Sequence, residues 1–206
     1  MQGIGTKVPR TILKGENLRT VKYIYAVLVV IAAMGSASSL RALEAEAGLG
    51  ASYFDPSDSA FRDFYKPGLS FGPEAKFFWD NGFGVGTNLD YFTSSRTYAG
   101  DKFSVDAFSL ESSLLYSYQG HPLLRPYLGV GLSLNLAMEK GRGKNTVNDF
   151  DLGYLLGGGL EFKTKYVVPY VQVSYRAIPD DKGINLGGWR TGIGVQYRFP
   201  KKKSKP

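Results

Sequence analysis

The chain carries few side chains that could do bond-breaking chemistry. It has no cysteine and a single histidine, His121, in the stretch "QGHPLL". A cysteine nucleophile, a thiolate metal site and a histidine-rich metal site are therefore excluded. A Ser–His–acid triad needs a carboxylate near the histidine, and none is close in sequence. We expect no metal, no other cofactor and no enzymatic activity.

The remaining chemically active residues are charged, and they fall on one face of alternating segments. In "GLSFGPEAKFFWD" (68–80) odd positions are mainly bulky and apolar, whereas even positions carry mainly glycine, serine or a charge. Such alternation is typical of a β-strand, and the following Asn81-Gly82 is a strong hairpin signal. The same division recurs at 46–54, 83–93, 103–118, 126–138, 150–163, 167–177 and 188–199, which predicts eight strands in all.

The connections between these segments alternate in length. Short connections lie at 81–82, 119–125 and 163–166, and longer polar ones at 55–67, 94–102, 139–149 and 178–187. Short turns at one end and longer loops at the other predict an all-β, eight-stranded, antiparallel up-and-down barrel over residues 45–199, with both chain ends on the short-turn side.

Side-chain volume decides which face points outward. The interior of an eight-stranded barrel is just wide enough for side chains to fill. The bulky face carries most of the aromatic residues and more than a dozen Leu, Ile and Val, which cannot all fit inside, whereas the small face can. The apolar face must therefore contact something apolar, and a closed barrel in a bilayer meets this requirement. We predict a transmembrane β-barrel.

Aromatic residues gather at both ends of the strands, as in the girdles of membrane barrels. At the short-turn end they are Trp79, Phe83, Tyr116, Tyr118 and Phe162. At the long-loop end they are Tyr53, Tyr91, Phe103, Tyr175 and Trp189.

The small face also carries nearly balanced charges, which we expect to pair and plug the lumen because an unpaired buried ion is costly. These residues are Glu74, Lys76, Asp90, Glu111, Asp151, Glu161, Arg176, Arg190 and Arg198. A proton relay or a gate is the alternative role for them. Leu115 and Leu155 also point inward and would suit a narrow channel for small or apolar solutes.

The excess positive charge lies at the two ends of the chain. Five basic residues, the apolar run "YIYAVLVVIAAM" (23–34) and the small residues "GSASS" follow one another, which is typical of a secretory signal peptide. Cleavage after Ala37 is preferred, with Ala47 as the alternative, and residues 200–206 form a lysine-rich tail expected in the periplasm. Residues 48–199 hold fifteen basic and fifteen acidic residues, so no nucleic-acid-binding face is expected.

The stretches "PYLGVGLSL" (126–134), "PYVQVSYR" (169–176) and the terminal "GVQYRF" resemble the small outer-membrane β-barrels of OmpA and OmpX type. The resemblance implies a monomer in the outer membrane of a Gram-negative bacterium, delivered by periplasmic chaperones and the outer-membrane assembly machinery. Gly194, Tyr197 and Phe199 match the glycine and two aromatic positions of the assembly signal. In that family the aromatic residue usually ends the chain, whereas a tail follows it here.

For function, the sequence favours a structural, envelope-stabilising or adhesive role through the surface loops. Lys140, Arg142 and Lys144 in "EKGRGKNTVND" could meet lipopolysaccharide phosphates, and 56–67 carries three aromatic residues that could form a short amphipathic turn on the rim. A channel of OmpW-like type is the alternative. A lipid A-modifying enzyme fits less well, because His121 lies at the short-turn, periplasmic end.

Overall fold

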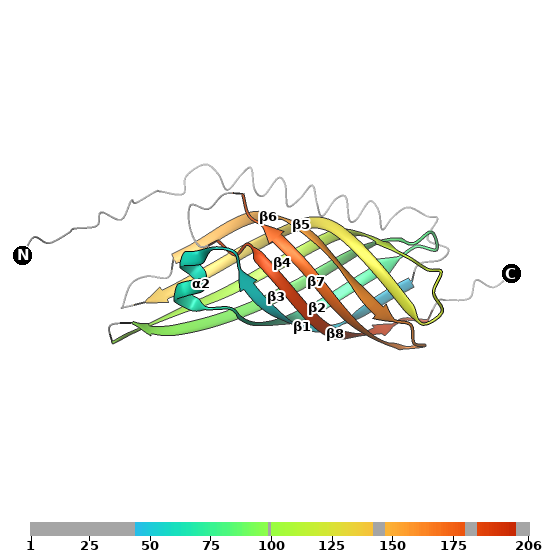
Figure 1. Cartoon of the computed structure of the whole chain (residues 1–206), viewed down its shortest axis with the longest axis horizontal. Helices are drawn as coiled ribbons and strands as arrows, with labels where there is room; N and C mark the ends of the chain where they lie inside the picture. Colours follow the sequence, from blue (N-terminus) through green and yellow to red (C-terminus); the bar gives the residue numbers. More distant parts are fainter. Residues whose placement is uncertain (1–43, 99, 142–146, 180–184, 201–206) are drawn as a thin grey trace, which may run out of the picture. The chain divides into compact units, whose positions relative to one another are not determined.

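The computed structural model describes residues 44–98, 100–141, 147–179 and 185–200. Nearly all of them belong to β-strands, and one short helix lies between the first two strands (Figure 1). The elements are β1 (Glu44–Pro56), α2 (Ser59–Tyr65), β2 (Gly68–Phe78), β3 (Phe83–Tyr98), β4 (Asp101–Ser117), β5 (Leu124–Gly141), β6 (Val147–Phe162), β7 (Val167–Ala177) and β8 (Gly188–Arg198). Within this part of the chain, no helix is long and apolar enough to cross a membrane.

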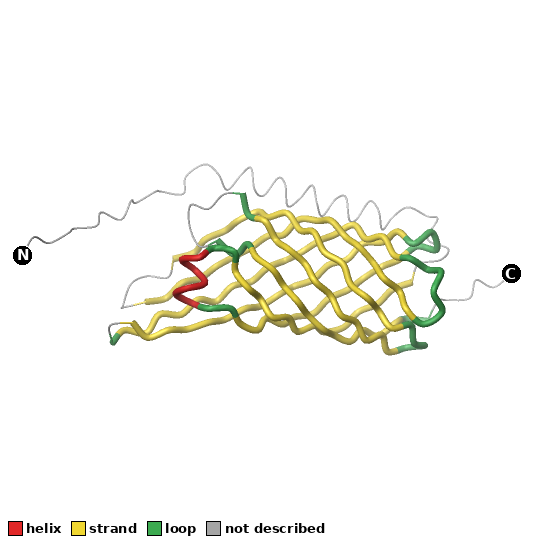
Figure 2. The backbone as a smooth tube through the Cα atoms, viewed as in Figure 1, coloured by secondary structure: helices red, strands yellow, loops and turns green. Residues whose placement is uncertain are grey.

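The eight strands form one closed barrel. Each strand pairs antiparallel with its neighbour in sequence, and β1 pairs with β8 to close the wall. At this closing seam Glu46 lies opposite Arg198, and Tyr53 lies opposite Thr191. Figure 2 shows the strands crossing the wall obliquely. The predicted eight-stranded up-and-down topology is confirmed.

The faces of the wall are arranged as the volume argument requires. Leu49, Leu69 and Leu128 on the outer face are each about 70% exposed, at 68%, 71% and 69%. Glu161 and Gln196 on the inner face are fully buried. A barrel with an apolar exterior and a polar interior is built for lipid, because all its backbone hydrogen bonds are made within the closed sheet.

Two long loops of the sequence prediction are largely strand. The prediction of a loop at 94–102 is wrong, because β3 and β4 pair as far as Tyr98 and Asp101. The loop predicted at 139–149 is also too long, since β5 extends to Gly141 and β6 begins at Val147. These extensions have polar residues on their outer face, so the apolar–polar alternation that marks a membrane strand stops while the hydrogen-bonded ladder continues. Gly100 turns the β3–β4 hairpin with a positive φ of 86°.

The connection between β1 and β2 forms the helix α2. The Asp58 carboxylate caps it by accepting the Phe61 N–H at 3.1 Å, and Lys66 ends it with a positive φ of 65°. Its aromatic side chains face into the barrel mouth, while Arg62 is exposed. The expected amphipathic turn is thus a helix that inserts into the mouth instead of resting on the rim.

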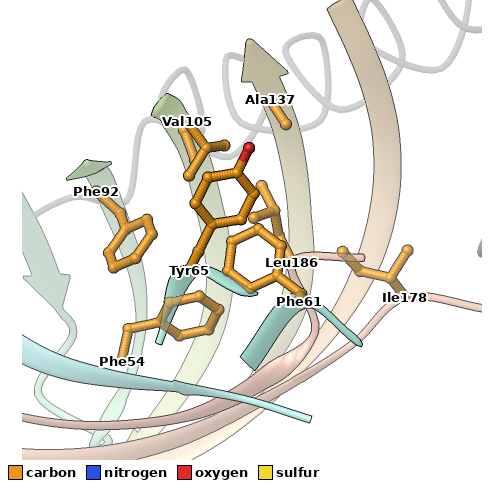
Figure 3. Packing of buried hydrophobic residues seen from close by; sticks show 9 residues of the cluster. Phe54, Phe61, Tyr65, Phe92, Val105, Ala137, Ile178 and Leu186 are labelled. Carbon is orange, nitrogen blue, oxygen red and sulfur yellow. The ribbon is translucent and has the colours of Figure 1, made fainter. Parts of the chain in front are cut away.

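Figure 3 shows the cluster in which the α2 side chains are buried. Phe61 and Tyr65 of α2 are each 6% exposed and pack against apolar residues from several strands. The other members are Phe54, Phe92, Val105, Ala107, Ala137, Ile178 and Leu186. We call this set the mouth cluster; it fills the long-loop end of the lumen with apolar side chains.

Candidate functional site

The charged lumen holds a first group of ion pairs towards the short-turn end. Arg125 of β5 is its centre and is only 1% exposed. Its Nε lies 2.5 Å from the Glu161 carboxylate, and its Nη2 lies 2.6 Å from the Glu46 carboxylate. A third bond joins Nη1 to Glu44. The guanidinium also lies over the Phe78 ring, 4.3 Å from its centroid, so one cation serves three carboxylates.

Two further cations complete this group. Lys76 Nζ lies 2.8 Å from Glu161 and is placed between the rings of Tyr127 and Tyr170, at 4.2 and 4.5 Å from their centroids. Arg198 Nε lies 2.8 Å from Glu46 across the closing seam. We call Glu44, Glu46, Lys76, Arg125, Glu161 and Arg198 the short-turn cluster; its three acids and three bases balance.

A second group, the middle cluster, lies farther along the lumen and is built around Glu111. The same carboxylate oxygen accepts from Arg176 Nη2 at 2.5 Å and from Arg190 Nη1 at 2.6 Å. Arg190 Nη2 reaches Asp90 at 3.0 Å, and Arg176 Nη1 donates to the Ser109 hydroxyl at 2.9 Å. This group is also balanced, with two acids and two bases, as buried charges require.

The predicted lumen residues are therefore mostly brought together. Glu74 is buried and accepts a hydrogen bond from Gln196, next to these clusters. Asp151 is half-buried on β6, where the Asn135 side chain donates to its main-chain carbonyl at 3.4 Å. The placement of Arg125 in a short turn is wrong, because β5 begins at Leu124 and Arg125 faces the lumen opposite Glu161.

Sequence reasoning also missed Glu44 and Glu46, which lie at the start of β1 beside a candidate cleavage point. A signal for these residues was present in the spacing. Glu46 has the same parity as the small inward positions Gly48 and Gly50, and Arg125 has the same parity as Gly129 and Gly131. Glu46 already lay on the inner face of the predicted strand 46–54, and extending the predicted strand 126–138 back by one residue would have included Arg125.

A small cavity lies within the lumen. A cavity of about 70 Å³ lies between the two clusters and is lined in part by Leu115 and Leu155. Leu115 itself is buried against Phe78 and Tyr127. The two leucines do point inward as expected, but they border room for only a few water molecules.

Hydrogen bonds hold α2 in the mouth of the barrel. The Tyr65 hydroxyl donates to Glu139 of β5, and the Ser94 hydroxyl donates to the Tyr65 carbonyl at 2.5 Å. Arg96 donates to the Asp63 carbonyl at 2.6 Å. Burial, together with the bond to Glu139, raises the pKa of the Tyr65 hydroxyl well above its usual range. The extended β3 and β5 strands thus supply the atoms that hold the helix.

The outer face carries aromatic rings at both ends, as predicted. At the short-turn end Phe83 packs on Tyr116 with centroids 5.2 Å apart, and at the mouth Tyr175 packs on Trp189 at 5.0 Å. The other outward members are Tyr53, Trp79, Tyr91, Tyr118 and Phe162, of which Trp79 is half-buried beside its turn.

The assignment of Phe103 to the girdle is wrong. Phe103 shares the inward parity of Val105 and packs against the mouth cluster and Phe64, at 5.5 Å between ring centroids. Its aromatic type suggested lipid contact, but its place in the strand alternation puts it on the opposite face.

The last strand presents the three assembly-signal positions on different faces. Tyr197 and Phe199 face outward, with ring centroids 5.2 Å apart, and the Phe199 N–H donates to the Ala45 carbonyl at 2.9 Å. Gly194 faces inward, where a β-carbon would lie 2.1 Å from the Tyr170 hydroxyl oxygen. Its lack of a side chain is therefore required by lumen packing.

The remaining candidates are at the surface. Lys140 is exposed at the mouth, with its Nζ 3.7 Å from Asp106, whereas Arg142 and Lys144 lie outside the described residues. His121 Nδ1 accepts the N–H groups of Leu123 and Leu124, at 3.2 and 3.0 Å. This bonding gives His121 a turn-forming role at the short-turn end. No cluster of potential metal ligands occurs among the residues the structure describes.

An apolar outer wall with aromatic rings at both ends, closed by eight antiparallel strands around a lumen with buried ion pairs, defines a small transmembrane β-barrel of the outer-membrane class. The chain belongs to the family described as "Outer membrane protein beta-barrel domain", which it matches over residues 24–203. We therefore place it in the outer membrane of a Gram-negative bacterium. No protein with a curated description matches it.

Solved structures show the same fold. The Neisserial surface protein A (NspA) is 17% identical, covers 76% of this chain and 97% of its own, and superposes with a TM-score of 0.57. The attachment invasion locus protein Ail of Yersinia pestis is 15% identical, with coverages of 76% and 97% and a TM-score of 0.50. A major outer membrane protein of Thermus thermophilus is 16% identical, with coverages of 77% and 100% and a TM-score of 0.50. At these identities the likeness establishes the fold alone.

Proposed function

We propose that this protein is a structural barrel of the outer membrane whose lumen is closed to solutes and which acts through its rigid mouth. The observation that supports the proposal is the presence of three clusters of buried side chains along the lumen. The short-turn cluster and the middle cluster occupy the interior, and the mouth cluster covers them. A solute would have to break buried ion pairs, at a cost of several kcal/mol for each ion left unpaired.

A narrow channel is the competing function, and planar-bilayer conductance separates the two. The purified barrel should give no steady conductance steps in salt solution. A Phe61→Ala/Tyr65→Ala variant removes the aromatic stopper and should also stay closed, because both ion-pair clusters remain beneath it. Regular single-channel steps from the unaltered protein would refute the closed lumen.

Enzymatic activity on lipid A is not part of the proposal. His121 accepts two main-chain N–H groups in a short turn. This turn lies at the short-turn end of the barrel, whereas outer-leaflet lipid would be reached at the mouth. Overexpression should therefore leave the mass of lipid A unchanged. A mass shift that appears with the unaltered chain and disappears with His121→Ala would contradict this.

The mouth offers two surfaces through which such a barrel could act. The exposed side of α2, with Arg62 and Asp63, is held rigidly and suits an adhesive contact. On the lipid-facing side Lys140 and Lys102 lie on adjacent strands beyond the ring of Tyr91, at the level expected for lipopolysaccharide phosphates.

Binding of lipopolysaccharide in detergent micelles tests the second surface. A Lys102→Gln/Lys140→Gln variant should bind more weakly than the unaltered barrel, because two ammonium groups next to the lipid are lost. The matched control is Arg62→Gln, an exposed cation of α2 that is not on the lipid-facing wall. Equal binding by all three proteins would exclude these lysines as the contact.

A further inference from the structure

The short-turn end of the barrel presents a second set of cations, which the lumen does not use. Lys163 Nζ donates to the carbonyl oxygens of Gln119 and His121, at 3.0 and 2.7 Å, so it joins the β6–β7 turn to the β4–β5 turn. Lys165 Nζ lies over the Tyr166 ring, 4.9 Å from its centroid. Both ammonium groups are thus held at the rim of the barrel by neighbouring groups.

Exposed apolar and aromatic side chains lie in the same turns as these lysines. Leu123 is 67% exposed and Tyr118 is 58% exposed in the same pair of turns. Tyr166 stacks on Tyr197 of the outer wall, with ring centroids 6.3 Å apart. Aromatic and aliphatic residues mixed with lysine are typical of the boundary between hydrocarbon and headgroups, where the apolar part inserts and the ammonium stays in the polar layer.

The two ends of the barrel differ in charge. The described mouth carries both signs in similar number: Asp55, Asp58, Asp63, Asp101, Asp106 and Glu139 against Arg62, Lys66, Arg96, Lys102 and Lys140. In the described turns 79–82, 118–123 and 163–166, Asp80 is the single acid beside two lysines. The short-turn rim therefore has the more positive character.

The last strand ends beside this rim. The Arg198 N–H donates to the Tyr166 carbonyl at 2.7 Å, and its Nη1 donates to the Thr164 carbonyl at 3.1 Å. The chain thus leaves β8 beside the β6–β7 turn. The sequence then continues with Lys201, Lys202, Lys203 and Lys205.

We propose that this rim, centred on Lys163 and Lys165, binds the phosphate groups of anionic glycerophospholipids in the inner leaflet of the outer membrane. The ammonium groups lie at the level of the short-turn aromatic ring, where lipid phosphates of that leaflet are found. A peptidoglycan contact fits less well, because these cations are fixed to the turns at the membrane boundary. Together with the proposed lipopolysaccharide contact at the mouth, this rim site would let the barrel bind lipids of both leaflets of the outer membrane.

Quenching of tryptophan fluorescence by brominated lipids tests the proposal on the full mature chain. The reporter is Tyr166→Trp in a Trp79→Phe/Trp189→Phe background, refolded into phosphatidylcholine vesicles that contain either brominated phosphatidylglycerol or brominated phosphatidylcholine. The anionic lipid should associate about five-fold more strongly at this position at low salt, the effect of one lysine at a membrane surface. About 0.5 M sodium chloride should remove most of the preference, because charge attraction is screened.

The matched variant is Lys163→Gln/Lys165→Gln in the same reporter. It should bring the ratio of phosphatidylglycerol to phosphatidylcholine association close to one. The control reporter is Trp79 in a Trp189→Phe background; Trp79 lies in the β2–β3 turn of the same rim and should show little preference. Equal quenching by both lipids at the Tyr166→Trp position would overturn the proposal. So would a preference that survives the double substitution and disappears only when the chain is cut after Pro200.

Insertion of the barrel into the bilayer is checked separately, so that failure of the rim-site proposal can be distinguished from failure of the proposed barrel. Protease protection of the strands and a change of gel mobility on boiling report whether the barrel has formed in the bilayer. A protected barrel without lipid preference overturns only the rim site. Lysine-dependent pelleting with peptidoglycan sacculi, in place of lipid preference, would also overturn it.

Discussion

Replacing Arg125 with methionine removes the cation that three carboxylates of the short-turn cluster share. After this change Glu161 keeps Lys76 at 2.8 Å, and Glu46 keeps Arg198 at 2.8 Å. The partly buried Glu44 keeps Arg198 at 3.1 Å, so three acids then face two bases. Loss of one partner from a buried ion pair typically costs about 3–5 kcal/mol of unfolding free energy. Because every carboxylate retains one partner, we expect a value near the lower limit of that range.

The pairing itself can be measured with a double-mutant cycle between Arg125→Met and Glu46→Gln. In the double variant the number of acids and bases is balanced again, so it should be less destabilised than the two single changes added together. We expect a coupling free energy of about 1–3 kcal/mol. The contact of Arg125 with the Phe78 ring is absent from both the Arg125→Met variant and the double variant, so it cancels in the cycle.

The assay is reversible guanidinium unfolding of the lipid-embedded barrel, followed by tryptophan fluorescence, with gel mobility before and after boiling as the check of folding. The control cycle combines Arg125→Met with Asp90→Asn, because Asp90 pairs with Arg190 in the middle cluster. That pair should be additive within about 0.5 kcal/mol. If the coupling free energy between Arg125→Met and Glu46→Gln were no larger than that of the control cycle, the inferred ion pairing in the short-turn cluster would be refuted.

Three further results are expected. Gly194→Ala should destabilise the barrel by about 1–3 kcal/mol through overpacking against Tyr170. If packing is the cause, the same substitution should cost less in a Tyr170→Ala background, and an unchanged cost would favour a role in assembly recognition alone. Phe61→Ala should increase proteolysis at the mouth while the strands stay protected, and unfolding of the whole barrel would contradict the view of α2 as a separate stopper. Mass spectrometry of the exported protein should place the cleavage before Glu46, as a cut after Ala37 does, because Arg125 needs that carboxylate; a mature chain that lacks Glu46 would contradict this.

Strand alternation explains why the membrane part of the fold was predictable. A strand shows apolar–polar alternation when its two faces meet different solvents. This holds for strands such as β2 and β8, which lie between lipid and lumen. Beyond the bilayer both faces can be polar, so the β3 and β4 extensions to Tyr98 and Asp101 looked like a loop. Phe103 shows the related error, in which residue type was allowed to outweigh parity.

The lumen shows how far parity leads without register. Parity placed Lys76, Glu111 and Arg190 inside, but it did not say which acid meets which base. The antiparallel register decides this, since it sets Arg125 opposite Glu161 and Arg198 opposite Glu46 across the seam. Contacts between non-adjacent strands, such as Arg190 with Asp90 over a separation of 100 residues, depend on the closed shape as well.

The sequence alone determined the closed antiparallel barrel and its outward apolar face, because both follow from a local pattern repeated eight times. The outer-membrane location was predicted from the resemblance to a known family. The tertiary structure alone decided what closes the barrel. The sequence predicted a short amphipathic turn on the rim within 56–67, and only the width of the mouth and the apolar side chains that line it make burial of Phe61 and Tyr65 inside the barrel favourable. The grouping of ten lumen charges into two balanced clusters likewise depends on distances across the barrel that no local pattern contains.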